Sequence, residues 1–156
     1  MEHRKGNLFT SSQMALGHGV NCKGLMGAGI AKMFKENYPL NYREYQAACG
    51  VGDPRLGPTM LLPGRSLITM EDNRRIVNMA TQYHPGRDAR YTWLHLAARD
   101  AMLGLERLGI RSMAIPEIGC GIGGLRWDLV ESILLELEDE FNGALHHGFE
   151  FEVWHY

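Results

Sequence analysis

Residues 118–125 read Ile-Gly-Cys-Gly-Ile-Gly-Gly-Leu, so four of these eight positions are glycine. The stretch lies between an apolar run at 112–115 and a helical pattern that starts near Trp127. Because glycine has no side chain, a ligand can approach the bare backbone N–H groups of such a turn. Bare N–H groups beside a helix N-terminus favour an anion, most often a phosphate. The stretch therefore predicts a strand, a phosphate-binding turn and a helix, in that order.

A second glycine-rich turn, Gly-Leu-Met-Gly-Ala-Gly-Ile at 24–30, follows a short apolar run at 14–21. Its position after a predicted strand and before a predicted helix makes it a second candidate for binding an anion. The chain holds 19 glycines in 156 residues, which exceeds the usual share of about 7%, and the excess gathers in these two turns. Two such turns predict a ligand with two phosphates that is held from both sides.

Apolar periodicity predicts that strands and helices alternate along the chain. Strands are expected at 14–21, at 58–70 in two pieces split by a Pro-Gly turn, and at 74–81, 111–118 and 149–153. Three-four spacing of apolar residues predicts helices at about 30–37, 39–50, 89–108 and 127–141. This alternation implies a layered α/β domain with a largely parallel sheet. Ligands of such sheets sit beyond the carboxyl ends of the strands, where both glycine turns are expected to lie.

Length and charge restrict the class of protein. A chain of 156 residues predicts one domain, spanning 1–156. The formal net charge of −2 argues against a general nucleic-acid or membrane-surface binder, because such proteins carry a basic excess. No apolar run approaches the roughly 18 residues of a membrane span, and the charged start is unlike a signal peptide. We therefore expect a cytoplasmic protein with no membrane partner.

Cysteine and histidine usage gives no sign of a metal. The three cysteines, Cys22, Cys49 and Cys120, are odd in number and lack CxxC spacing, so neither a disulfide framework nor a zinc site is expected. Cys120 lies inside the glycine turn, where a small side chain that fits the turn is favoured over a nucleophile. The adjacent His146 and His147 lack carboxylates or thiols at ligand spacing. The prediction is no metal and no cofactor.

The motifs together resemble the macrodomain, the ADP-ribose-binding fold. The matching pieces, in the family's order and spacing, are Gly6-Asn7-Leu8, Asn21 with 24–31, and 116–125 before Trp127. The resemblance covers nearly the whole chain and implies three α/β/α layers around a mixed, largely parallel sheet. Within the family the chain is most similar to a branch of ADP-ribosyl glycohydrolases. That branch includes antitoxins that remove ADP-ribose from DNA.

The resemblance assigns roles to residues position by position. Asn7, where the family often has aspartate, would contact the adenine amino group, and the Leu8 backbone N–H would contact the adenine ring. Asn21 would lie near the distal ribose, and Thr81 would line the ligand site. The two diphosphate loops would consist of Gly27, Ala28, Gly29 and Ile30 on one side and Gly119, Cys120, Gly121, Ile122 and Gly123 on the other.

The chain departs from the branch beside the strand at 74–81. Hydrolases of the branch carry a Thr-Lys pair there, whereas this chain has Thr81-Gln82. A lysine amine can attack the ribose C1″ and form a Schiff base after ring opening, and a glutamine cannot. Some relatives also have an aspartate where this chain has Gly123. A hydrolase with this sequence therefore needs a route that does not use lysine.

Three functions remain open. The first is a hydrolase that removes mono-ADP-ribose from glutamate or aspartate by positioning a water molecule, with Asn21, Gln82 and His84 as catalytic candidates. The second is a module that binds ADP-ribose without turnover, and the third is an ADP-ribose-1″-phosphate phosphatase. The expected partners are ADP-ribose or an ADP-ribosylated protein, with nucleic acid only as a modified substrate, and the chain is expected to be a monomer.

Several polar residues near the predicted site each allow two interpretations, one functional and one structural. His84 is either a general base or a solvent-facing loop residue. Arg87 and Arg90 either clamp the ligand or are exposed charges. Asp88 is favoured as the N-cap of the helix predicted from about residue 89. Glu117 either faces the ribose or forms a salt bridge.

Overall fold

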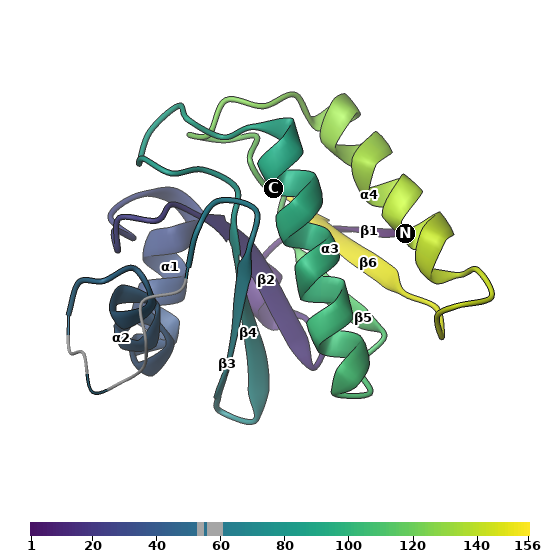
Figure 1. Cartoon of the computed structure of the whole chain (residues 1–156), viewed down its shortest axis with the longest axis horizontal. Helices are drawn as coiled ribbons and strands as arrows, with labels where there is room; N and C mark the ends of the chain where they lie inside the picture. The colour runs from purple at the N-terminus through teal and green to yellow at the C-terminus, as the bar shows by residue number, and fades with distance from the viewer. Residues whose placement is uncertain (53–54, 56–60) are drawn as a thin grey trace.

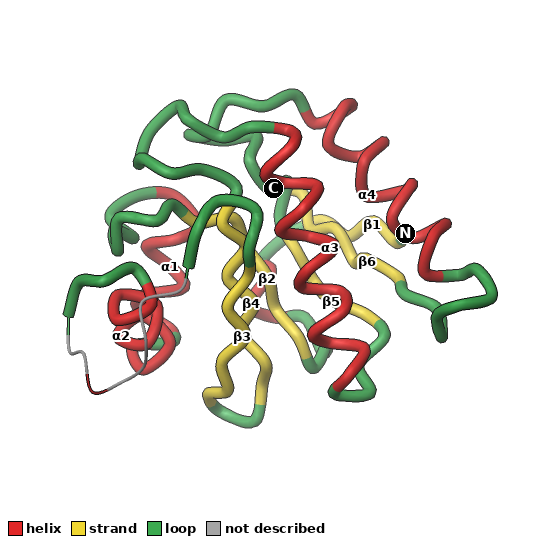
Figure 2. The backbone as a smooth tube through the Cα atoms, in the orientation of Figure 1, coloured by secondary structure: helices red, strands yellow, loops and turns green. Residues whose placement is uncertain are grey.

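A six-stranded sheet runs through the computed structural model, which describes residues 1–52, 55 and 61–156 (Figures 1 and 2). The strands are β1 (Glu2–Lys5), β2 (Ala15–Val20), β3 (Ser66–Glu71), β4 (Arg74–Ala80), β5 (Ser112–Ile115) and β6 (Glu150–His155). The helices are α1 (Gly29–Asn37), α2 (Pro39–Ala48), α3 (Tyr91–Arg107), α4 (Trp127–Phe141) and the short 3-10 turn η1 (Leu8–Thr10). Among the described residues, none of these helices has the length and apolar character that crossing a membrane requires.

The strands lie in the order β1-β6-β5-β2-β4-β3. Every neighbouring pair is parallel except β3 and β4, which form an antiparallel hairpin. The hairpin turns at Asp72 and Asn73, which both have positive φ, as a two-residue turn between twisted strands requires. The sheet is therefore mixed and largely parallel, and the predicted α/β fold class is confirmed.

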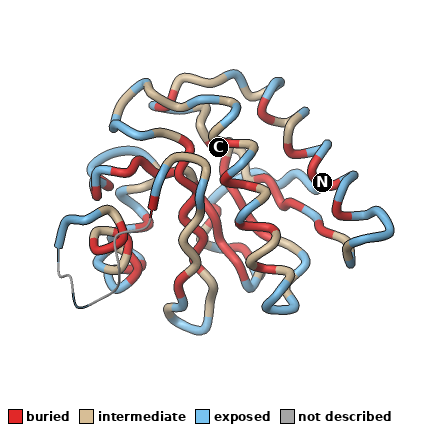
Figure 3. Tube along the Cα trace, in the orientation of Figure 1, coloured by how far each residue is buried: buried red, intermediate tan, exposed pale blue. Residues whose placement is uncertain are grey.

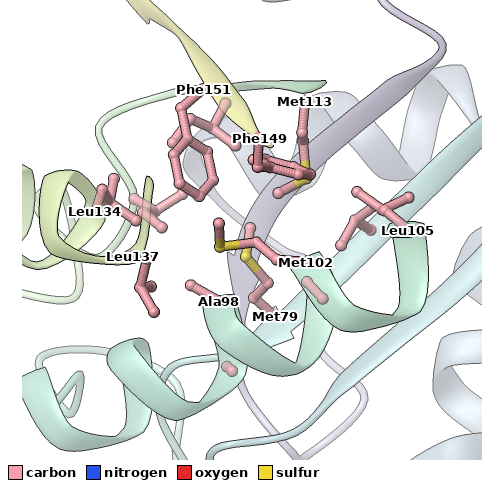
Figure 4. Packing of buried hydrophobic residues seen from close by; sticks show 14 of the residues in the cluster. Met79, Ala98, Met102, Leu105, Met113, Leu134, Leu137, Phe149 and Phe151 are labelled. Carbon is pink, nitrogen blue, oxygen red and sulfur yellow. The ribbon is translucent and has the colours of Figure 1, made fainter. Parts of the chain in front are cut away.

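Alternating side chains of the strands supply two apolar faces, which helices cover. Helices α3 and α4 pack on one face (Figure 4), and α1 and α2 pack on the other. Strand residues that face α3 and α4 are Ala15, Val77, Met79, Met113, Ile115, Phe151 and Val153. Strand residues that face α1 and α2 are Leu16, Val20, Ile76, Ala80 and Ala114. Burial is concentrated on the central strands and on the inner sides of the helices (Figure 3), which gives the predicted three layers.

The structure differs from the predicted strands in two places. Strand β1 was not predicted, because its four residues are all polar and exposed and so show no apolar alternation. The apolar piece predicted as a strand at 60–62 forms none at Leu61 and Leu62, while Met60 lies outside the described residues. The buried Leu61 donates its backbone N–H to the Ala48 carbonyl instead, so its apolar character serves the packing of α2.

The start of α3 also differs from the prediction. The helix begins at Tyr91, and its N-cap is Arg90, which makes no side-chain capping bond. Asp88 is therefore not the N-cap. Its carboxylate accepts the backbone N–H groups of Tyr83 (3.1 Å) and His84 (2.9 Å), which ties together the loop between β4 and α3.

The parallel strands place their carboxyl ends at one edge of the sheet. The loops that follow β2, β4 and β5 leave this edge on the way to α1, α3 and α4, and β6 ends there as well (Figure 1). Residues from distant parts of the sequence therefore meet beside the two glycine turns.

Candidate ligand-binding and active site

A pocket of about 580 Å³ opens at the carboxyl edge of the sheet. It is lined by residues 19–21, 25, 27–31, 81–82, 85–86, 116–123 and 156. These residues come from the ends of four parallel strands and from the loops that follow them. All predicted site residues line this pocket except Asn7, Leu8 and His84. The structure therefore brings the two glycine turns to the same cavity.

The first glycine turn presents the N-terminus of α1 to the pocket. The N-cap residue Ala28 is extended, and no side chain caps the helix. Gly29 has a φ of 60°, which a residue with a side chain rarely adopts. A Cβ atom on Gly27 would meet no atom within 4 Å, so this face of the turn is open. Uncapped N–H groups at the positive end of a helix suit an anionic ligand.

The second glycine turn combines a packed position with an open one. A Cβ atom on Gly123 would lie 2.8 Å from the Gly119 carbonyl oxygen and 2.9 Å from the Cβ of Ala89. A Cβ atom on Gly121 would meet nothing within 4 Å. The backbone N–H of Leu125 donates to the Gly119 carbonyl at 2.8 Å and closes the turn. Position 123 therefore has no room for a side chain, whereas position 121 faces open space.

The two turns approach each other across the pocket through Ile122. The Cδ1 atom of Ile122 would be 3.4 Å from a Cβ atom on Gly29, and the Ile122 side chain is 55% exposed. Ile122 is thus an apolar bridge between the loops, and a ligand that lies between the loops would contact it.

Asn21 is held rigidly at the end of β2. Its Nδ2 donates to the Leu25 carbonyl (2.8 Å), and its Oδ1 accepts the backbone N–H of Lys23 (2.9 Å) and the hydroxyl of Tyr45 (2.9 Å). The buried Tyr45 hydroxyl also lies 2.8 Å from the Asn21 backbone carbonyl. An amide nitrogen carries two N–H donors, so the second donor of Asn21 can serve a ligand in the pocket.

The Gln82 side chain offers the pocket an acceptor. Its Nε2 donates to the backbone carbonyls of His84 (2.7 Å) and Gly86 (2.9 Å), which uses both amide N–H groups. Its Oε1 faces the second glycine turn, 3.2 Å from where a Cβ atom of Gly123 would stand. The neighbouring Thr81 hydroxyl lines the pocket, is buried and has no hydrogen-bond partner. A buried hydroxyl without a partner is costly, and a bound ligand or water would satisfy it.

His84 and the N-terminal candidates lie outside the pocket. The His84 side chain is exposed and packs edge-on against Tyr83, while its backbone is held by Gln82 and Asp88. Asn7 is exposed, and its Oδ1 accepts the backbone N–H of Phe9 at 2.9 Å, while Leu8 is fully buried. A role for His84 in catalysis stays a prediction that this arrangement does not favour.

The end of the pocket nearest to Asn7 is formed by Tyr156. The backbone N–H of Gly6 donates to the His155 carbonyl at 2.8 Å. Asn7 is the next residue after Gly6, and Tyr156 is the next residue after His155, so this bond brings Asn7 to the Tyr156 end of the pocket. Tyr156 lines the pocket, and its side chain is 69% exposed. Sequence reasoning missed this residue, although the parallel pairing of the last strand would have placed its end at the same edge.

Two further lining residues have identifiable signals in the sequence. Gly19 lies inside β2, and a Cβ atom there would be 2.9 Å from the Thr81 hydroxyl oxygen. A glycine inside a strand often marks such a close approach, and this signal was overlooked. Glu117 lines the pocket, and its Oε1 lies 3.5 Å from the Nδ1 of His155. A contact between Glu117 and the ribose stays a prediction.

The Cys120 side chain is in its protonated thiol form near neutral pH, which is a poor nucleophile. Burial raises the pKa of Cys120 to about 11, and its Sγ lies 3.3 Å from the Ile118 carbonyl. The thiolate is the nucleophilic form of cysteine, so little of it is present near neutral pH. Across residues 1–52, 55 and 61–156, no group of three or more His, Cys, Asp or Glu side chains is placed to hold a metal ion.

Comparison with curated proteins identifies relatives that include glycohydrolases and phosphatases. The DNA ADP-ribosyl glycohydrolase of Thermus aquaticus is 32% identical over 152 residues, which cover 97% of this chain and 39% of that protein. This chain thus spans about two-fifths of the length of that relative. The ADP-ribose 1″-phosphate phosphatase of Meyerozyma guilliermondii is 28% identical over 162 residues, which cover 86% of this chain and 91% of that protein.

Solved structures and the family comparison agree with the fold. The macrodomain of Thermus aquaticus DarG superimposes with a TM-score of 0.82 at 29% identity, covering 99% of this chain and 97% of that one. Residues 18–134 match the Macro domain family, and this range includes both glycine turns and most of the pocket lining. The chain therefore belongs to the macrodomain family, as its motifs predicted.

Proposed function

We propose that this chain binds ADP-ribose in the pocket and hydrolyses the bond between the distal ribose and an acceptor. The observation that carries the proposal is that both glycine turns line the same pocket, with the uncapped N-terminus of α1 on one side. Backbone N–H groups on two sides suit a diphosphate. The curated relatives are named for enzymes that act on ADP-ribosyl groups or on ADP-ribose 1″-phosphate, which supports the same ligand here.

The two ends of the pocket differ in chemistry, and this difference orients the ligand. Tyr156 offers an aromatic face at one end, beside Asn7, which suits the adenine ring. Asn21 and Gln82 offer an amide donor and an acceptor at the other end, which suits a ribose and a water molecule. The distal ribose therefore lies at the Gln82 end, and its acceptor leaves the pocket there.

The hydrolysis proceeds through a positioned water molecule. Gln82 Oε1 accepts a hydrogen bond from the water, whose oxygen attacks C1″ as the bond from C1″ to the acceptor breaks. The ribose passes through an oxocarbenium-like state, as in glycoside hydrolysis. The attacking water gives up one proton to the surrounding solvent. The departing acceptor takes up the bonding electron pair and one proton from solvent, so the products are free ADP-ribose and the unmodified acceptor. No Schiff base forms at position 82, because that position holds no amine.

The acceptor class is a separate part of the proposal. The sequence prediction of a glutamate or aspartate ester rests on leaving-group chemistry, since a carboxylate departs without strong acid assistance. Four of the curated relatives carry DNA ADP-ribosyl glycohydrolase in their names, which favours DNA. We give DNA the greater weight and keep the ester as the alternative outcome of the assay.

A phosphatase acting on ADP-ribose 1″-phosphate is the second candidate. The yeast enzymes of that name align over 91% to 96% of their own length, so they consist of little more than the part that this chain matches. Only the leaving group differs, because the same pocket would hold the same ADP-ribose portion.

A release assay separates these functions. The protein is incubated in turn with ADP-ribosylated single-stranded DNA, with a glutamate-linked ADP-ribosylated protein and with ADP-ribose 1″-phosphate. We expect free ADP-ribose from the DNA substrate. Phosphate release from the third substrate alone would support the phosphatase, and binding of ADP-ribose without any release would leave a binding module.

The role of Gln82 is tested in the same assay. Gln82→Ala removes the acceptor for the water molecule and should lower turnover at least tenfold, about 1.4 kcal/mol in barrier height. Reduction with borohydride during turnover should trap no adduct, since a Schiff base requires an amine. Unchanged turnover in the variant, or a trapped adduct on the native chain, would remove this mechanism.

A further inference from the structure

Cationic and aromatic side chains gather at the Gln82 end of the pocket. We define the cationic rim as Lys23, Tyr83, Arg87, Arg90 and Trp93. Lys23 Nζ lies 4.3 Å from the centre of the Tyr83 ring, and the Arg90 guanidinium carbon lies 4.4 Å from the Trp93 ring. The sequence shows no basic stripe, because these residues come from the loop after β2, the loop after β4 and the first turn of α3.

The rim is fixed to the pocket wall by the loop between β4 and α3. Gln82, Pro85 and Gly86 line the pocket, and the chain passes directly from Gly86 to Arg87. The Arg87 side chain lies over the second glycine turn, because a Cβ atom on Gly124 would be 2.7 Å from its Nε. The backbone N–H of Cys22 donates to the Tyr83 carbonyl at 3.0 Å and joins the two loops that carry the rim.

The charge of the rim is unbalanced. It holds three cations, and the carboxylate beside them is Asp88, which lies 3.6 Å from Arg90 and accepts two backbone N–H groups of its own loop. The Arg90 side chain is 63% exposed, so its charge and its planar face are available to a partner. A local positive field in a chain of net charge −2 attracts an anionic partner to this place on the surface.

The aromatic rings distinguish between anionic partners. An acidic peptide would use the cations alone. A single strand of nucleic acid presents phosphates to cations and unpaired base faces to aromatic rings and guanidinium planes, which is the combination found here. A duplex hides those base faces within its stack. Tyr83, which is 37% exposed, and the Arg90–Trp93 pair therefore favour an unpaired strand.

We propose that the cationic rim binds the single-stranded DNA that carries the ADP-ribosyl group. Lys23 and Arg87 contact phosphates, and Tyr83 and the Arg90–Trp93 pair contact bases next to the modified nucleotide. This inference rests on the proposed function, which places the acceptor at the Gln82 end of the pocket.

Fluorescence anisotropy with unmodified DNA tests the rim independently of turnover. The probe is a fluorescein-labelled single strand of about 12 nucleotides, with its duplex and poly-glutamate as comparisons. Arg90→Ala should weaken single-strand binding about fivefold or more, because it removes the guanidinium plane that contacts a base. Tyr83→Ala should weaken single-strand binding to a similar extent but leave duplex binding within about twofold.

Arg107→Ala is the matched control, because it removes the same charge from the exposed far end of α3. It should change single-strand affinity by less than about twofold, since that position contacts no strand bound at the rim. An equal loss in Arg107→Ala and Arg90→Ala would overturn the proposal, as would tighter binding of poly-glutamate than of DNA.

Free ADP-ribose is titrated into the same proteins by calorimetry. If the native chain fails to bind ADP-ribose, the proposed function fails, whatever the DNA result. If the native chain binds ADP-ribose but Arg90→Ala and Arg107→Ala bind DNA equally, the rim alone is wrong. If Arg90→Ala loses ADP-ribose and DNA affinity to the same extent, Arg90 belongs to the pocket and the rim assignment is likewise wrong.

Discussion

The glutamine at position 82 can both donate and accept hydrogen bonds, and its surroundings in the fold determine which of these the pocket receives. The resemblance described above marks position 82 as the place where hydrolases of that branch would have lysine, whereas this chain has glutamine, whose amide can donate or accept. The structure occupies both amide donors with the carbonyls of His84 and Gly86, so only Oε1 remains for the pocket. Whether the Gln82 side chain offers a donor or an acceptor to the pocket depends on how the loop from 82 to 90 folds back on itself. No local pattern in the sequence predicts that loop conformation.

The same contrast holds for the predicted roles of Asn21 and His84. Asn21 lines the pocket as predicted, but its contacts with Leu25 and Tyr45 also make it the anchor of the first loop. His84 has the right chemistry for a base, but its side chain is exposed and Asp88 accepts its backbone N–H, so its catalytic role stays a prediction. Residue type is readable from the sequence, whereas the direction of a loop side chain is not.

Two neighbouring glycines give a prediction about packing. Gly123→Ala places a methyl group 2.8 Å from the Gly119 carbonyl oxygen, and the backbone must shift to accommodate it. We expect a loss of about 1–3 kcal/mol in the free energy of unfolding. Gly121→Ala places the methyl group in open space and should stay within about 0.5 kcal/mol of the native protein.

Denaturant unfolding of both variants measures this difference. Equal stabilities would mean that the second turn is not packed as described, and a larger loss in Gly121→Ala would reverse the assignment of the open face.

At the scale of elements, periodic segments were predicted well, whereas the edge strand β1 was not predicted. Helices α3 and α4 carry apolar residues at three-four spacing, and the buried strands β2, β4 and β5 are apolar runs. Strand β1 lies at the edge of the sheet with four exposed polar residues, so burial left no pattern in its sequence. It forms because its backbone pairs in parallel with β6, a partner almost the whole chain away.

His18 joins α1 to the sheet and makes stability depend on pH. It is fully buried in β2, stacks on Phe34 of α1 at 3.8 Å and shares a 2.9 Å hydrogen bond with Asn78 of β4. Its Nδ1 has no partner, so a proton there would put an unpaired charge in the core. Burial therefore lowers the pKa of His18 from 6.5 to about 4, against the smaller opposing effect of the Asn78 hydrogen bond.

The consequence is a loss of stability on acidification. Between pH 6.5 and about 4 the unfolded chain binds a proton at His18 that the folded chain does not. The free energy of unfolding should fall as the pH falls through this window, by up to about 3 kcal/mol from this group. His18→Gln should be less stable at pH 7, because the ring stack is lost, but should show a shallower decline.

Urea unfolding of both proteins across this pH range isolates the contribution of His18, since all other groups are common to the pair. Parallel stability curves for the native protein and the variant would contradict the account.

At the scale of the whole molecule, parallel pairing turns separate motifs into one site. Residues near positions 20, 30, 82, 120 and 156 line one pocket because β2, β4, β5 and β6 all end at the same edge. The sequence predicted this edge and both glycine turns. It could not predict the cationic rim, because the rim depends on which loops lie next to each other. We propose that residues 1–156 form one domain, since one sheet contributes to all three core clusters.

The most direct test is calorimetric titration of ADP-ribose into the native chain and into Gly121→Glu. A Cβ atom at Gly121 would meet nothing within 4 Å, so the substituted side chain has open space to enter where we propose that the diphosphate lies. The account predicts saturable one-site binding to the native chain and loss of that binding in the variant, with an unchanged unfolding midpoint. Absence of heat from the native chain at millimolar ADP-ribose, or full affinity in Gly121→Glu, would contradict it.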